Sequence, residues 1–379
     1  MDYDFETQMD RRLSGSVKYT RAPEGTLAFT IADSDFMTAP AIQKALEEKL
    51  SCRDYGYLIP KVEFTESFMN WFQRTYRFEL EREWLLPVSG VVPALAVASQ
   101  VRSGGVIANV PNYGILLSAP KRAGKEVIEV PLKCLRTEPG LETWEIDFDS
   151  LEEAVTPDTD FFYLCNPHNP VGRVYSMEEL QRVSSFARKH HLIVVSDEIH
   201  CEILYDRRHI PFFTVDEYAM EHTILLTAPG KTFGIPGIGG AFAVIPNREL
   251  REKFQEVSYA LGRPNLFGVA ALTAAYRDCD EWKQGLLTYL KRNRDYLEAE
   301  VRRRFPKAIQ THVEGTYLAW IDFGAYIREE EQEKWLSDHA RVMFQGAAFF
   351  HGTGHIRWNF ATQHENIREA LGRIEEALN

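Results

Sequence analysis

Short apolar runs recur along the first two thirds of the chain, and each is followed by polar or turn-forming residues. Residues 161–165 precede Asn-Pro-His-Asn-Pro, residues 192–196 precede Asp-Glu-Ile-His, and residues 223–227 precede Ala-Pro-Gly-Lys. Runs of this length that are apolar on both faces are typical of buried strands in a parallel sheet. Amphipathic segments between such runs, as at residues 40–50, predict covering helices. The pattern therefore predicts an α/β fold with a mostly parallel sheet flanked by helices.

Three of these strand ends carry side chains that are suited to chemistry. Asn169, Asp197 and Lys231 each lie just beyond one of the three runs. Because ligands of open α/β sheets bind at the carboxyl ends of the strands, we expect the three residues to meet at one edge. A desolvated lysine has a lowered pKa and becomes a nucleophilic amine suited to Schiff-base chemistry. The alternative interpretation is three ordinary strand ends with an exposed lysine.

A lysine, a carboxylate and an amide together match the requirements of pyridoxal 5′-phosphate (PLP). The lysine can carry the aldehyde, the carboxylate can keep the pyridine nitrogen protonated, and the asparagine can hydrogen-bond the ring hydroxyl. A nucleotide-binding P-loop is excluded, although Gly230-Lys231-Thr232 resembles the end of that motif. The motif requires a glycine five residues before Gly230, and the chain has Leu225 there.

The motifs NPHNPVGRVYSMEEL, SDEIHCEILYD and APGKTFGIPG resemble those of the fold-type I PLP-dependent enzymes, the aspartate aminotransferase superfamily of class I/II. Within it, His168 and His200 are similar to the cystathionine β-lyase/C–S lyase (cystalysin-like) branch, whereas aminotransferases more often carry tyrosine at the latter position. The resemblance covers nearly the whole chain. It implies an N-terminal arm over residues 1–40 that also joins the small domain, a large PLP-binding domain over 41–280, and a small α/β domain over 281–379.

The resemblance also implies roles for individual residues. Lys231 would bind PLP and move the Cα proton, Asp197 would face the ring nitrogen, and Tyr113 would stack on the pyridine face. These three are the expected catalytic residues. Asn169 and His200 would complete the contacts to the ring.

A phosphate site is expected where Ser89-Gly90 precedes an apolar helix. Proline suits the first helical position, so we expect the helix to begin at Pro93 and the N–H groups of Gly90, Val91 and Val92 to bind an anion. Ser-Gly before a helix is a weak signal alone, but its order in the chain matches the family.

One further phosphate contact is expected from a second subunit. In the family, the tyrosine of a Gly-Tyr pair reaches across a dimer interface to the cofactor phosphate. Tyr57 matches this residue, with Tyr55 as a second choice. A buried structural tyrosine is the alternative for Tyr57.

Substrate binding is expected to involve Arg357, Asp33 and Tyr317. Arg357 matches the arginine that binds the substrate α-carboxylate, because a bidentate guanidinium suits that planar group. A surface arginine is the alternative. Asp33 belongs to Ala-Asp-Ser-Asp-Phe, which resembles a family segment near the substrate, and Asp35 in that segment either lies at the site or caps the helix after Ala39.

The chain departs from the family pattern at several positions. Gly230, Gly234 and Gly239 stand where relatives usually carry a serine, an asparagine and a phosphate-binding arginine, and the segment 349–355 is short. The implied activity is PLP-dependent β-elimination from an L-cystathionine- or cysteine-conjugate-like amino acid, which gives pyruvate, ammonia and a thiol. The alternatives are an aminotransferase for an unusual amino acid, for example in a specialised biosynthetic pathway, and a regulatory binding protein on the same fold.

The composition agrees with a globular protein, since 45% of the 379 residues are hydrophobic and 26% are charged. A net charge of −12 argues against nucleic-acid and anionic-membrane partners. No stretch approaches the ~18 apolar residues of a membrane span, and the acidic N-terminus does not resemble a signal peptide. The five cysteines lack CxxC spacing, so we expect no metal site. The composition therefore predicts a cytoplasmic protein, and the family resemblance implies a homodimer that acts on a small amino-acid substrate.

Overall fold

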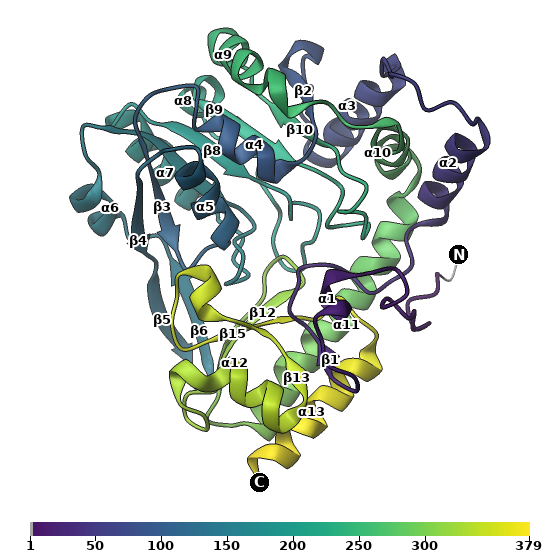
Figure 1. Cartoon of the computed structure of the whole chain (residues 1–379). Coiled ribbons are helices and arrows are strands. Elements are labelled where there is room, and N and C mark those ends of the chain that lie inside the picture. Colours follow the sequence, from purple (N-terminus) through teal and green to yellow (C-terminus); the bar gives the residue numbers. More distant parts are fainter. Residues whose placement is uncertain (1–2) are drawn as a thin grey trace.

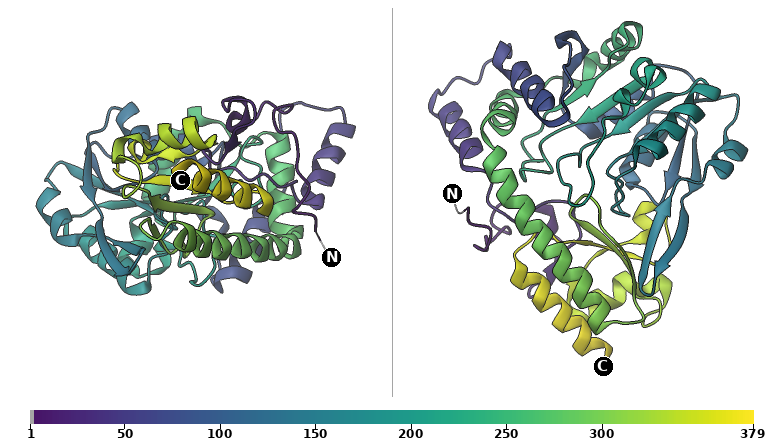
Figure 2. Two further views of the ribbon diagram at one scale, coloured as in Figure 1. Left: turned by 90° about the horizontal axis from the view of Figure 1, so that it is seen from below. Right: turned by 180° about the vertical axis from the view of Figure 1, so that it is seen from behind.

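A computed structural model describes residues 3–379 of the chain. Figure 1 shows a larger α/β part above a smaller one, and the long helix α11 (Asp280–Arg304) runs from one to the other. The two views of Figure 2 show the same helix lying beside α13 (His364–Leu378) at its far end. The helix therefore links the two parts. The division of the chain into domains at residue 281 stays a prediction.

The larger sheet has seven strands in the order β2-β10-β9-β8-β7-β3-β4. The pairs from β9 to β4 are parallel, whereas β10 runs antiparallel to both of its neighbours. The strands are β2 (Leu85–Val88), β3 (Gly105–Val110), β4 (Val127–Pro131), β7 (Thr159–Cys165), β8 (Ile193–Asp197), β9 (Thr223–Thr227) and β10 (Ala241–Val244). This confirms the predicted mostly parallel sheet. The three apolar runs that precede Asn169, Asp197 and Lys231 are the adjacent strands β7, β8 and β9.

Helices cover this sheet, and α2 begins at Pro40 as the sequence predicts. They are α2 (Pro40–Ser51), α3 (Val62–Tyr76), α4 (Val91–Ala98), α5 (Gly114–Arg122), α6 (Phe148–Ala154), α7 (Met177–Lys189), α8 (Glu217–Glu221), α9 (Arg248–Ser258) and α10 (Leu266–Asp278). The prediction that a helix begins at Pro93 was wrong by two residues, because Gly90 is the N-cap of α4 and the proline lies within its first turn. Among residues 3–379, no helix has the length and apolar character needed to cross a membrane.

The smaller part is built on a six-stranded sheet in the order β14-β15-β12-β11-β6-β5. Its strands are β5 (Lys133–Glu138), β6 (Leu141–Glu145), β11 (Ile309–Thr311), β12 (Leu318–Asp322), β14 (Gln345–Gly346) and β15 (Ile356–Asn359). The hairpin of β5 and β6 comes from within residues 41–280, so the second sheet also uses chain that the sequence division places in the large domain. Near the N-terminus, α1 (Val17–Thr20) precedes β1 (Leu27–Ala28), which pairs with β13 (Val342–Met343); α12 (Gln332–Trp335) lies in the same part of the fold.

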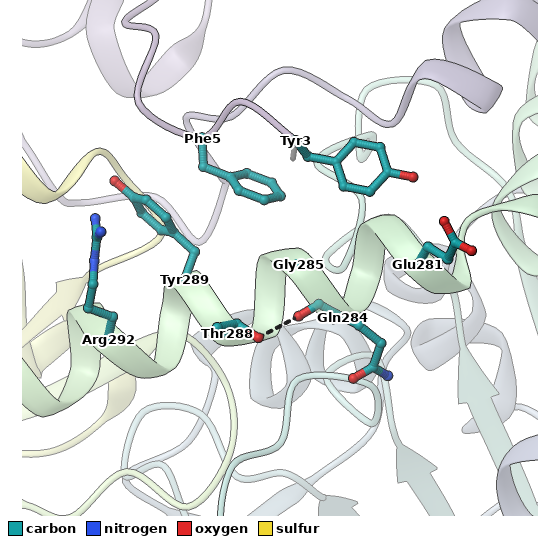
Figure 3. A pocket seen from close by; sticks show the side chains of 8 residues that line it. All are labelled: Tyr3, Phe5, Glu281, Gln284, Gly285, Thr288, Tyr289 and Arg292. Carbon is teal, nitrogen blue, oxygen red and sulfur yellow. Dashed lines mark hydrogen bonds between the residues drawn. The ribbon is translucent and has the colours of Figure 1, made fainter. Parts of the chain in front are cut away.

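The N-terminal arm packs against α11. Figure 3 shows Tyr3 and Phe5 above the helix face that carries Gly285, where a Cβ atom would lie 3.4 Å from the Phe5 ring. Glu6 accepts hydrogen bonds from the Tyr289 hydroxyl at 2.8 Å and from Arg292 at 2.7 Å. These contacts fix the arm before it continues toward the carboxyl edge of the larger sheet.

Candidate active site

A cavity of about 720 Å³ lies at the carboxyl ends of the parallel strands. This volume is typical of sites for small molecules. Nine of the predicted site residues line it: Gly90, Val91, Val92, Tyr113, Asn169, Asp197, His200, Lys231 and Arg357. Tyr57, Asp33 and Tyr317 do not belong to the lining. The cavity therefore brings together side chains from strand ends that are far apart in the sequence.

Lys231 lies in the turn after β9, and its Nζ donates a hydrogen bond to the Ala32 carbonyl oxygen at 2.6 Å. Burial lowers the pKa of this amine to about 8, and the Arg357 cation acts in the same direction against the Asp33 and Asp197 carboxylates. An amine with this pKa is neutral far more often at physiological pH than an ordinary lysine, which makes it a better nucleophile. The alternative of an exposed surface lysine is wrong.

Asp197 is the last residue of β8 and is buried. Its Oδ1 accepts a hydrogen bond from the Ile199 backbone N–H at 3.2 Å. Burial raises the pKa of the carboxyl group to about 6, although this N–H and the Lys231 cation oppose the change. A buried carboxylate of this kind is stabilised by a cation placed directly against it, and a protonated pyridine nitrogen is such a cation.

The turn after β7 is held by His168, which leaves Asn169 facing the cavity. His168 Nε2 donates to the Pro111 carbonyl oxygen at 2.8 Å, and its Nδ1 accepts from the Tyr175 hydroxyl at 2.8 Å. Burial lowers the pKa of His168 to about 4, so the ring stays neutral and its role is structural. Asn169 Oδ1 accepts from Arg357 at 3.3 Å, which orients the amide nitrogen for donation to a ring oxygen.

Arg357 extends from β15 of the smaller sheet and is 3% exposed, so the alternative of a surface arginine is wrong. It donates to the Thr30 carbonyl oxygen and to Asn169, and its Cζ lies 4.8 Å from the centre of the Phe350 ring. Burial lowers the pKa of the guanidinium to about 10, so it remains charged at neutral pH. Within the described chain its Nε has no hydrogen-bond partner. A buried cation with an unused donor is suited to binding an anion.

The first turn of α4 opens onto the cavity through Gly90, Val91 and Val92. N–H groups in a first helical turn have no acceptor within the helix, and the helix dipole favours an anion there. Tyr113, the residue before α5, also lines the cavity. Burial, together with the Asp197 carboxylate, raises the pKa of its hydroxyl to about 12, so it stays protonated.

Two of the unusual glycines, Gly230 and Gly239, line the same cavity as this anion site and add no side chain to it. At Gly230 a Cβ atom would lie 3.5 Å from Pro236 Cα, an ordinary contact, so a serine would fit there. Gly234 and Gly239 have φ values of 65° and 78°, in the left-handed region that favours glycine. A Cβ atom at Gly234 would also approach Ser34 Oγ to 2.7 Å. An anion here would therefore be held largely by backbone N–H groups.

The predicted acidic residues of the arm, Asp33 and Asp35, form ion pairs with cations of the same arm and do not line the cavity. Asp33 pairs with Arg11 and does not line the cavity. Asp35 accepts from Lys18 at 2.7 Å, Arg11 at 2.7 Å and the Tyr19 hydroxyl at 2.8 Å. The interpretation of Asp35 as a helix cap is wrong, because Ala39 is the N-cap of α2 and the arm supplies cations that bind this carboxylate instead.

Tyr317 and His200 lie against each other, with ring centres 5.7 Å apart. The Tyr317 hydroxyl donates to the Ala32 carbonyl oxygen at 3.1 Å, so it supports the acceptor of Lys231 and does not line the cavity. His200 does line it, and burial together with the Lys231 and Arg357 cations lowers its pKa well below the usual value. Among residues 3–379 its Nδ1 has no partner, which leaves a neutral ring nitrogen available at the site.

Tyr57 lies outside the cavity of its own chain. It is fully exposed, so the alternative of a buried structural tyrosine is wrong. Its expected contact with a cofactor phosphate stays a prediction.

Sequence reasoning missed several residues that line the cavity: Arg21, Ala32, Ser89, Gln345 and Phe349. Ser89 directly precedes the predicted anion site, and this adjacency was a usable signal. Ala32 begins the Ala-Asp-Ser-Asp-Phe segment, so it also had a signal. No motif distinguishes the other three residues, which are Arg21, Gln345 and Phe349.

The residues present fit PLP. The cavity offers an amine of lowered pKa, a buried carboxyl group, a helix N-terminus for a phosphate, and a buried guanidinium with an unused donor. Each of these matches one part of the cofactor or of an amino-acid substrate.

Comparisons with known proteins agree with this site. The family described as aminotransferase class I and II matches residues 25–374. Cystathionine beta-lyase PatB of Bacillus subtilis (strain 168) is 30% identical over 393 residues, which cover 99% of this chain and 100% of the relative. The structure of cystalysin from Treponema denticola, which contains a pyridoxal 5′-phosphate cofactor, has a TM-score of 0.93 at 30% identity and covers 100% of this chain and 99% of that chain.

A further solved structure, the PLP-bound C–S lyase from Staphylococcus hominis, has a TM-score of 0.90 at 29% identity and covers 100% of this chain and 98% of that chain. The motifs, the cavity and these relatives agree. The chain belongs to the aminotransferase class I and II family of fold-type I PLP enzymes, in the branch of the cystathionine β-lyases and C–S lyases.

Proposed function

We propose that this protein catalyses PLP-dependent β-elimination from an L-amino acid whose Cβ carries a sulfur leaving group. The Cα–H and Cβ–S bonds break, one water is consumed, and the products are pyruvate, ammonia and a thiol. The observation that carries the proposal is that Lys231, Asp197 and Arg357 line one cavity. Full-length similarity to a cystathionine β-lyase favours elimination among the reactions that such a cavity serves.

Arg357 positions the substrate in this mechanism. Its buried guanidinium binds the α-carboxylate, and its contacts with Thr30 and Asn169 fix the direction in which it can donate. Tyr113 and Asn169 line the same cavity as Lys231 and would hold the pyridine ring of PLP in place. PLP, when bound, supplies the electron sink for the electron pair of the broken Cα–H bond.

Lys231 moves the proton. Its lowered pKa keeps a useful fraction of the amine neutral, so Nζ can accept the Cα proton as a general base. The Ala32 carbonyl oxygen, which accepts from Nζ at 2.6 Å, stabilises the ammonium that results. Since the Tyr317 hydroxyl also donates to Ala32, this acceptor is held in place when the lysine moves.

An aminotransferase is the second candidate, because the family that matches the chain includes enzymes of that activity. The same residues would bind the amino acid and move the same proton. The two candidates differ in whether a thiol leaves and whether a 2-oxo acid is consumed.

We also infer that the active unit is a homodimer in which Tyr57 of one subunit contacts the phosphate site of the other. Exposed apolar residues cluster at the end of α2, at the start of α3 and in the connection between them, and exposed patches of this kind mark contact surfaces. They are Leu50, Tyr55, Tyr57, Ile59 and Val62. Val92, in the anion-binding turn of α4, is also 41% exposed, so a partner could reach that turn.

The reaction can be tested with L-cystathionine and the PLP-loaded protein. We expect pyruvate and free thiol in equal amounts, without any added 2-oxo acid. Replacement of Lys231 with alanine should lower the rate by about 10²–10⁴-fold, the usual contribution of a general base. Lys253→Ala, which changes an exposed lysine of α9, is the matched control. Amino transfer that depends on a 2-oxo acid and releases no thiol would contradict the proposal.

The lowered pKa of Lys231 predicts a pH dependence for cofactor uptake. Condensation with an aldehyde requires the neutral amine, so the rate at which the PLP-free protein binds PLP should rise with pH and level off above about 8. The measurement is the growth of visible absorption after mixing at a series of pH values. A rate that continues to rise to the pKa of an ordinary lysine would contradict a desolvated amine.

The dimer can be tested by sedimentation and by PLP titration. We expect a dimer, and we expect Tyr57→Phe to remain dimeric while its affinity for PLP falls about tenfold, the effect of losing one hydrogen bond to a charged group. Tyr259→Phe, at a tyrosine that is 93% exposed, should keep the original affinity. A wild-type protein that sediments as a monomer would refute the inference. So would a Tyr57→Phe variant that binds PLP as tightly as the wild type.

A further inference from the structure

Two polar side chains of the cavity have no part in binding PLP or the α-carboxylate. They are Arg21, which directly follows α1, and Gln345, which is paired in register with Arg357 across β14 and β15. Across residues 3–379, neither side chain makes a hydrogen bond or an ion pair with another protein group. Both are therefore available to a ligand in the cavity.

The backbone on both sides of Arg21 is fixed. Before it, Lys18 and the Tyr19 hydroxyl bind Asp35 at 2.7 and 2.8 Å. After it, the Arg12 guanidinium donates to the carbonyl oxygens of Ala22 at 3.1 Å and Pro23 at 3.2 Å. Arg21 is thus presented at the mouth of the cavity from an ordered segment, so little backbone entropy is lost when its side chain binds a ligand.

Two acidic residues of the arm, Asp33 and Asp35, are already paired with other cations. Arg11 pairs with both Asp33 and Asp35, and Lys18 also pairs with Asp35. The positive charge of Arg21 is therefore not compensated by these carboxylates. Although the whole chain has a net charge of −12, the mouth of this cavity presents a cation in addition to Lys231 and Arg357 deeper inside.

The wall of the cavity also includes apolar side chains, among them Ile31, Ile115 and Phe349. A ligand that reaches Arg21 from Arg357 would thus combine an amino-acid head, an apolar stem and an anionic end. An aliphatic thioether that ends in a carboxylate has this form.

We propose that Arg21 determines leaving-group specificity by binding a second carboxylate at the end of the sulfur substituent, with the Gln345 amide beside it. The preferred substrates are then acidic S-conjugates of L-cysteine, and the released thiol carries a carboxylate. This inference rests on the proposed β-elimination for its reaction, but the binding preference itself does not depend on turnover.

The first test compares kcat/KM for S-(2-carboxyethyl)-L-cysteine and S-propyl-L-cysteine, which differ mainly in the terminal charge. The wild type should prefer the acidic conjugate. In Arg21→Gln the ratio of the two values should fall about tenfold, as expected for one partly exposed charge-assisted hydrogen bond. Arg21→Lys should keep part of the ratio, and added salt should reduce it in the wild type.

Arg122→Gln is the matched control, because Arg122 is an exposed arginine in the last turn of α5 that does not line the cavity. It removes the same charge and should leave the ratio unchanged. A wild-type preference for the neutral conjugate would overturn the proposal. An Arg21→Gln variant that loses activity on both conjugates equally would also overturn it, since Arg21 would then act on the fold or on a feature common to both substrates.

The second test separates this proposal from the proposed reaction. L-2-aminopimelate and L-2-aminoheptanoate have no sulfur leaving group and differ in the terminal carboxylate, so their dissociation constants report binding alone. Tighter binding of aminopimelate that Arg21→Gln reduces about tenfold supports the proposal even if no conjugate is eliminated. Equal binding of the two compounds by the wild type overturns it, whether or not elimination occurs.

Discussion

Two cations, Lys231 and Arg357, and one buried carboxyl group, Asp197, share a single cavity, and no pair of them forms a salt bridge there. Removing a charge from water costs several kcal/mol unless a partner restores its interactions. The pKa of each of the three groups is displaced toward its neutral form. A phosphate, a protonated ring and a substrate carboxylate would supply the missing partners, so the site is organised around the charges of its ligands.

The N-terminal segment connects the two sheets at this point. Its backbone carbonyl groups accept from Arg357 at Thr30 and from Lys231 at Ala32. Asn359, two residues after Arg357, donates to the carbonyl oxygens of Ile31 at 2.6 Å and Asp33 at 2.8 Å. The arm therefore positions the lysine of the larger sheet and the arginine of the smaller sheet relative to each other. The same arm places Arg21 at the mouth of the cavity.

The parts of the site that the sequence predicts are those with a local signal. Buried parallel strands are apolar on both faces, so the ends that carry Asp197 and Lys231 could be located without knowing the neighbouring strands. The wider resemblance to the family then added Tyr113 and Arg357. The cap interpretation of Asp35 followed an equally local rule and was wrong, because Lys18, 17 residues earlier, provides a stronger partner.

The parts that could not be predicted depend on contacts between distant segments. Gln345 enters the cavity because β14 pairs with β15, and this register has no signature in so short a strand. The hairpin of β5 and β6 joins the second sheet through the pairing of β6 with β11, more than a hundred residues away. Arg21 has no motif, and its position follows from the ion pairs that fix the arm.

We propose that Lys231 is the residue that binds PLP covalently, and the chemistry of the site depends on it. Borohydride reduction of the PLP-loaded protein, followed by proteolysis and mass spectrometry, locates the pyridoxyl group directly. We expect one modified site per chain, on the peptide that contains Lys231, and no incorporation in Lys231→Ala. A pyridoxyl group on another lysine, or none at all in the wild type, would contradict it.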